Sequence, residues 1–175
     1  MFTPAARMNI TRDEAAGRAR LLDVATYEVA IDLTVGERTF GSATTVTFTC
    51  TEPGAEVFAD LISEEVGSIT LNGAALDPST VHDGTRLRLT DLAADNVLTV
   101  VARCPYMNTG EGLHRFVDPV DKSVYLYSQF EVADSRRVFT VFDQPDLKAT
   151  FTFTVTAPAD WQVVSNQASD RKSVV

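Results

Sequence analysis

Apolar and polar residues alternate along most of the chain with a period of two, which is typical of β-strands that bury one face. The alternation is longest at residues 27–35, 40–50 and 150–156, and shorter runs lie at 56–61, 66–71, 86–89 and 97–102. In the 150–156 run, Phe151, Phe153 and Val155 are predicted to face the core. Residues 104–122 show no alternation and are expected to be irregular, and Trp161–Val164 is expected to begin one more strand.

Two stretches have helical features instead. Thr11 with Glu14 has the form of a capping box, so a helix is expected from there to about Leu21. A second short helix is expected over residues 133–142, with Asp134 as its N-cap and Arg136 and Arg137 on its exposed side.

Many short strands without a βαβ rhythm indicate an all-β, mainly antiparallel domain in two layers, a sandwich with a short N-terminal helix and one short helical turn. We expect a helix and lead-in at residues 1–22, one β domain at 23–167 and a tail at 168–175, where the alternation is lost.

The strand predicted from residue 124 onward has an unusual polar face. Val124, Leu126, Ser128 and Phe130 fall on a mostly apolar face that is expected to be core, and Tyr125, Tyr127, Gln129 and Glu131 fall on the other. Phenols, a carboxamide and a carboxylate can together hold a small cationic ligand. The same residues would equally suit a strand face that meets water and ends in a turn.

Composition narrows the functional classes. The 175 residues are 45% hydrophobic and carry a net charge of −9, which suits one domain with its own core and argues against a nucleic-acid partner. Cys50 and Cys104 both end apolar runs, which favours buried free thiols over a disulfide. No apolar stretch is long enough for a secretory signal or a membrane span, so no membrane partner and a cytoplasmic location are expected.

Three runs carry a family resemblance: YSQFE at 127–131, ADSRR at 133–137 and FDQPDLKA at 142–149. Together they form what we call the signature segment, residues 127–149. It resembles the signature block in the N-terminal domain of the aminopeptidase N family of zinc metallopeptidases, and GEGLHRFVD at 110–118 is similar to the preceding segment in actinobacterial members. The resemblance extends from about residue 9 to residue 166.

The resemblance implies a saddle-like, sandwich-type domain and two substrate-binding residues. Glu131 would help to hold the free α-amino group of a peptide, and Gln129 would line the pocket for its first residue. It also implies that further strands of this domain and a zinc-containing catalytic domain follow residue 175.

The chain itself lacks catalytic signatures. The family's zinc ligands come from an HExxH helix and a distant Glu, but neither His82 nor His114 begins an HExxH, and the GxMEN motif is also absent. Both histidines are therefore expected to be surface residues and not ligands, and no catalytic residue or metal site is expected in this chain. Asp143 and Asp146, which flank Gln-Pro, are expected to shape a turn.

Two functional classes follow from these observations. The first is the substrate-binding N-terminal domain of a zinc aminopeptidase, whose partners would be a peptide with a free N-terminus and the catalytic domain of the same full-length chain. The alternative is a free-standing, non-catalytic β-sandwich that serves as a binding or scaffold module. An in-frame HExxH downstream in the gene would distinguish the first from the second.

The 175-residue chain by itself should neither hydrolyse amino-acyl anilides nor contain stoichiometric zinc, because it lacks the ligand set. Anilide turnover and metal analysis of the purified chain test this. Turnover that a chelator abolishes, in a preparation free of host peptidases, would contradict it.

Overall fold

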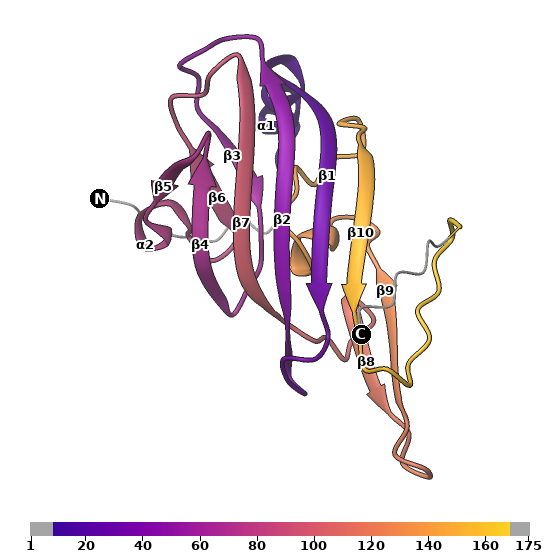
Figure 1. Ribbon diagram of the computed structural model, residues 1–175. Helices are drawn as coiled ribbons and strands as arrows, with labels where there is room; N and C mark the ends of the chain where they lie inside the picture. The colour runs from indigo at the N-terminus through magenta and orange to yellow at the C-terminus, as the bar shows by residue number, and fades with distance from the viewer. Residues whose placement is uncertain (1–8, 169–175) are drawn as a thin grey trace.

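A large six-stranded sheet is the main feature of the fold (Figure 1), which is a computed structural model that describes residues 9–168. The strand order is β10-β1-β2-β7-β4-β5. Its strands are β1 (Leu22–Asp32), β2 (Thr39–Cys50), β4 (Glu65–Leu71), β5 (Ala74–Leu76), β7 (Asp95–Pro105) and β10 (Thr150–Thr156). All neighbours are antiparallel except β1 and β10, which are parallel, so the sheet is mixed.

Two small sheets complete the β structure. Strands β3 (Val57–Asp60) and β6 (Arg86–Leu89) form one, and β8 (Gly112–Val117) and β9 (Val124–Gln129) form the other. Side chains from β3 and β6 join those of the large sheet in a single hydrophobic core. The prediction of a mainly β, largely antiparallel domain is therefore confirmed.

Helix α1 (Arg12–Leu21) begins where the sequence predicts. The Thr11 hydroxyl accepts a hydrogen bond from the backbone N–H of Glu14, and the Glu14 carboxylate accepts one from the N–H of Thr11. This capping box satisfies two N–H groups that the first helical turn leaves free. A four-residue helix, α2 (Pro78–Val81), precedes β6, and no helix among residues 9–168 is long and apolar enough to cross a membrane.

Most predicted strands are present, with shifted ends. β6 has the predicted bounds, and β4 ends at the predicted Asn72-Gly73 turn, where both residues have positive φ, 53° and 81°. β1 begins earlier than predicted and ends at Asp32, so Val35 lies beyond it and is exposed. Residues 104–122 are not irregular throughout, because they contain β8.

The predictions for the last strands are only partly right. Phe151 does point toward the core side, where its ring stacks on the buried Tyr27 ring at 4.5 Å. Phe151 and Phe153 nevertheless remain 42% and 47% exposed. β10 is the outermost strand of the sheet, and no strand in the described part of the chain lies beyond it. Residues 161–164 form no regular secondary structure, so the strand predicted there is wrong.

The helix predicted over residues 133–142 is also wrong in extent. Only Ser135–Arg137 is helical, as a single 3₁₀ turn, η1, and the Asp134 side chain does not cap it. Residues 138–142 are buried one after another. An amphipathic surface helix would turn some of them to solvent, so the burial of five consecutive residues is not the pattern of such a helix.

The β8–β9 hairpin projects from the body of the domain, with its tip directed away from the large sheet (Figure 1). This position explains why the predicted core face of β9 is not core. Leu126 is only half-buried and Ser128 is exposed, whereas Phe130, just beyond the strand, packs against the core. The N-terminal residues 1–8 and, apart from Ala168, the predicted tail at 168–175 lie outside the described residues.

Both cysteines are free and buried, as predicted. Burial raises the pKa of the Cys104 thiol to about 12, which suppresses the reactive thiolate. We expect a thiol reagent to label both cysteines at least about 100-fold more slowly in the native protein than in denaturant, because labelling requires opening of the fold. Rapid native labelling of either thiol would contradict the strand placement.

Candidate functional site

Gln129 and Glu131 lie where β9 gives way to a turn. Gln129 is the last residue of β9 and pairs with Gly112, the first residue of β8. Glu131 lies two residues further on, in a turn over residues 131–134. Tyr125, Tyr127 and Gln129 are exposed, as the alternation predicts, but Glu131 is outside the strand and is placed by the turn.

The two side chains have different surroundings. Oε1 of Gln129 accepts a hydrogen bond from the backbone N–H of Glu131, and Nε2 of Gln129 donates to the Glu131 carbonyl at 3.4 Å. The Glu131 carboxylate is exposed and makes no hydrogen bond or ion pair with the residues that the structure describes. Gln129 therefore supports the backbone of Glu131 and leaves its carboxylate available to a ligand.

A stacked pair of rings lies beside this site. The rings of His114 on β8 and Tyr127 on β9 stack at 4.7 Å, with 21° between their planes. Nδ1 of His114 accepts a hydrogen bond from the N–H of Gly110 at 3.0 Å, so the ring is held by stacking on one face and by a hydrogen bond at its edge. His114 is half-buried and structural here, not a free surface residue as the sequence suggested.

No metal centre is visible in the described residues. His82 is half-buried and lies 3.1 Å from the Leu61 carbonyl through Nε2. No group of three or more His, Cys, Asp or Glu side chains among residues 9–168 could hold a metal ion.

Arg137 connects the residue before β8 to the turn that follows β9. Its Nε donates to Oδ1 of Asp134 at 2.7 Å, and Nη2 lies 3.2 Å from Oε2 of Glu111. The Arg137 and Asp134 side chains are largely buried, whereas Glu111 is partly exposed. Gly112 has a positive φ of 60°, and a Cβ at this position would lie 2.8 Å from Cβ of Arg137. The start of β8 and η1 are therefore in direct contact.

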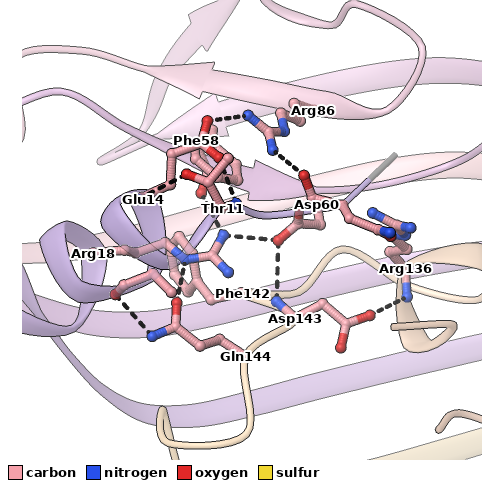
Figure 2. Close-up of polar contacts among 12 residues, drawn as sticks. Thr11, Glu14, Arg18, Phe58, Asp60, Arg86, Arg136, Phe142, Asp143 and Gln144 are labelled. Carbon is pink, nitrogen blue, oxygen red and sulfur yellow. Dashed lines mark hydrogen bonds and ion pairs between the residues drawn. The ribbon is translucent and has the colours of Figure 1, made fainter. Parts of the chain in front are cut away.

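The far end of the signature segment is held by a buried polar network (Figure 2). Arg18 of α1 is only 3% exposed, and its Nη1 lies 2.7 Å from Oδ2 of Asp60, which is equally buried. Nε of Arg18 donates to Oε1 of Gln144 at 3.0 Å, and Nε2 of Gln144 donates to the Ala15 carbonyl at 2.9 Å. The network thus joins α1, β3 and the signature segment.

Aromatic rings and a second ion pair enclose the network. The Arg18 guanidinium carbon lies 4.7 Å from the centre of the Phe58 ring, and that of Arg86 lies 3.9 Å from the same ring. Arg86 also pairs with Glu14 at 2.8 Å, and this hydrogen bond is the main cause that lowers the Glu14 pKa to about 2.

Asp143 bonds to a different part of the chain than the sequence suggests. Its Oδ2 accepts from the backbone N–H of Arg136 at 3.2 Å, and its own N–H donates to Oδ2 of Asp60 at 3.1 Å. Burial raises the pKa of Asp143. Arg136, predicted to be exposed, is only 5% exposed. Asp143 therefore connects η1 to β3, and its carboxylate makes no hydrogen bond within its own turn among the described residues, contrary to the prediction.

The sequence predicts Gln129 and Glu131 as substrate-binding residues, but it does not predict the contacts that hold this turn in place. The sequence predicts Arg137 on the exposed side of a helix and Asp134 as the N-cap of that helix. No pattern in the sequence predicts the network around Arg18. Gly110 and Gly112, which permit a tight backbone, are the local signal in the sequence that another segment packs closely here. Arg18 and its partners are separated by 42 and 126 positions, so no local pattern relates them.

Comparison with protein families gives one match over most of the chain. The model of the Peptidase M1 N-terminal domain matches residues 24–174. Aminopeptidase N of Streptomyces lividans is 56% identical over 161 residues, which are 90% of this chain. The chain spans only 19% of the length of that relative.

Solved structures share the fold. The M1 zinc metallopeptidase of Deinococcus radiodurans superposes on 80% of this chain and 33% of its own, with a TM-score of 0.62 and 23% identity. That protein has also been solved with a Tyr-Ser-Ala substrate, in an E323A mutant. Yeast LTA4 hydrolase in complex with bestatin covers 87% of this chain and 25% of its own, with a TM-score of 0.65 and 17% identity.

Removing one partner of the buried pair should destabilise the domain strongly. Arg18→Met leaves the Asp60 carboxylate buried without its cation, so the free energy of unfolding should fall by about 3–5 kcal/mol. The Arg18→Met, Asp60→Asn double variant should lose less than the sum of the two single variants. Urea denaturation followed by circular dichroism measures both effects.

The exposed pair between Arg88 and Glu56 provides the control. Arg88→Met removes a guanidinium from a solvated ion pair, so it should leave the denaturation midpoint unchanged within error. Equal effects of Arg18→Met and Arg88→Met would contradict a special role for the buried network.

Proposed function

This chain belongs to the peptidase M1 family as its N-terminal domain, and from that we propose that it binds the free α-amino group of a peptide substrate in a zinc-dependent aminopeptidase. Glu131 is the proposed anchor for the amine, and Gln129 is proposed to line the pocket for the first residue. The chain spans 19% of the Streptomyces aminopeptidase N, so the activity of a whole enzyme is part of the proposal.

The observation that carries this proposal is the state of the Glu131 carboxylate. The carboxylate is exposed and has no partner within residues 9–168. Glu131 lies two residues beyond the end of β9, in a turn whose last residue, Asp134, pairs with Arg137. A carboxylate offers charge-assisted acceptor bonds to an ammonium group, which neither Phe130 nor Val132 can provide. A carboxylate that binds the amine would place the first peptide bond at a constant position relative to the domain and so favour removal of single N-terminal residues.

Gln129 contributes through its amide. Because both ends of this amide face the backbone of Glu131, it limits the conformations that the anchor can adopt. Pre-organisation of this kind reduces the entropy lost when a ligand binds. A change at Gln129 would therefore affect the anchor and the first-residue pocket together.

The described residues do not fit a zinc ion, because no suitable group of ligands exists among them. We assign the zinc of this family to the catalytic domain of a longer protein and derive no reaction step from it here. The buried free thiols suit a reducing compartment, which supports a cytoplasmic location as part of the proposal.

Substitution of Glu131 in the full-length enzyme tests the proposal. Glu131→Ala should lower kcat/KM for free-amine peptides on the order of 10- to 1000-fold, because a charged contact with the substrate is lost. Gln129→Ala should lower it less, by an amount that varies with the first side chain of the peptide. Steady-state kinetics measure both, and a thermal melt confirms folding.

Glu28 provides a matched control, since it is an exposed glutamate on β1, away from the hairpin. Glu28→Ala should keep kcat/KM within about twofold of wild type. If Glu131→Ala behaves like Glu28→Ala, the amine-binding role is wrong, and a binding or scaffold module becomes the better interpretation of the chain.

A further inference from the structure

We propose that Arg137 is a positioning residue for Glu131: its guanidinium holds the turn that carries the amine anchor against the start of β8. This inference rests on the proposed function, because it concerns the same anchor. Arg137 does not pair with Glu131 itself, so it acts through the backbone of the turn.

The position of Glu131 depends on the turn over residues 131–134. The local hydrogen bonds of that turn are the two of the Gln129 amide, one from the Asp134 N–H to the Phe130 carbonyl at 3.3 Å and one from the Arg137 N–H to the Asp134 carbonyl at 3.1 Å. All four join residues between 129 and 137. They shape the turn but do not connect it to the rest of the domain.

Phe130 anchors the chain before the turn by packing on Phe139, and the Arg137 side chain provides the polar connection after it. Nε binds Asp134, the last residue of the turn, at 2.7 Å, and Nη2 binds Glu111 at 3.2 Å. Glu111 directly precedes Gly112, which pairs with Gln129 across the hairpin. The guanidinium thus links the chain just after Glu131 to the strand that lies beside Gln129.

Close packing restricts the Arg137 side chain that makes this link. A Cβ on Gly112 would lie 2.8 Å from Cβ of Arg137, so the Gly112 backbone lies directly against the Arg137 side chain, which has little room to move. Only 15% of that side chain is exposed, which limits screening of its ion pairs by water. A planar guanidinium can bind two carboxylates in fixed directions, whereas a lysine ammonium is a single flexible point charge.

The link also affects the charge near the anchor. Asp134 and Glu111 both pair with Arg137, which offsets part of their charge, and Glu131 is left as an acidic group of this region without a partner among the described residues. An incoming ammonium group is then directed to Glu131. Loss of Arg137 would free two competing carboxylates and release the turn at the same time.

The test uses the intact enzyme and a pair of inhibitors that differ only in the amine. Leucine hydroxamate carries the amino group, and its des-amino analogue, 4-methylpentanohydroxamate, does not. The ratio of their inhibition constants reports on amine recognition, and general damage to the fold affects both constants alike. The variants are Arg137→Gln, Asp134→Asn, Glu131→Ala and the Glu131→Ala, Arg137→Gln double variant, with Arg88→Gln as a control in an exposed ion pair.

Arg137→Gln should weaken leucine hydroxamate about tenfold and its analogue less than about twofold, because the anchor is displaced but the rest of the site is intact. In the Glu131→Ala background, the same change should add less than about twofold, because the two residues act as one unit. Asp134→Asn should weaken leucine hydroxamate about threefold, since the bond to Glu111 remains, and Arg88→Gln should change neither constant.

Three results would overturn the inference. Equal weakening of both inhibitors by Arg137→Gln would mean a purely structural role. An unchanged ratio in Arg137→Gln and Asp134→Asn, with a loss in Glu131→Ala, would remove the positioning role but leave the proposed function intact. An unchanged ratio in Glu131→Ala would overturn the proposed function and the inference with it. If Arg137→Gln fails to fold, Asp134→Asn and Arg137→Lys are judged by the same criteria.

Discussion

The buried guanidinium of Arg18 is the constraint on which the arrangement of this domain depends. A charged group that is 3% exposed needs its partners in place, and those partners come from β3, from the end of the signature segment and from two aromatic rings. The network therefore brings together α1, the small sheet and residues 142–144, which are far apart in sequence. Without it, the N-terminal helix would have few specific contacts with the core.

The signature segment is held at both ends, by different means. At its far end, Gln144 is buried and bonded to α1, and Asp143 is bonded to the backbone of Arg136. Near its beginning, Arg137 fastens the turn after β9 to the start of β8. Between these supports, residues 138–142 are buried in sequence and form part of the core. An exposed carboxylate at Glu131 is thus mounted on a rigid base, as a binding group needs to be.

The polar residues of the signature segment have unequal roles. Arg136, Asp143 and Gln144 make or lie in buried contacts, and Arg137 and Asp134 pair with each other. Glu131 differs from them because its carboxylate faces solvent with no partner in the described residues. Most polar residues of this motif therefore make structural contacts, and only the three-dimensional contacts separate them from Glu131, the proposed binding residue.

The sequence alone determined the elements whose signals are local. A period of two predicted the long strands, the Thr11–Glu14 capping box predicted the start of α1, and Asn72-Gly73 predicted a turn, because each signal depends on residues within a few positions of one another. It also led to the proposal that Gln129 and Glu131 bind substrate, through an unusual strand face and a family resemblance. Tertiary structure alone decided that Arg136 is buried, that Phe151 and Phe153 lie on an edge strand, that Arg137 pairs with Glu111, and that Arg18 pairs with Asp60. These outcomes depend on which distant segments become neighbours, and a local pattern of residues contains no information about that.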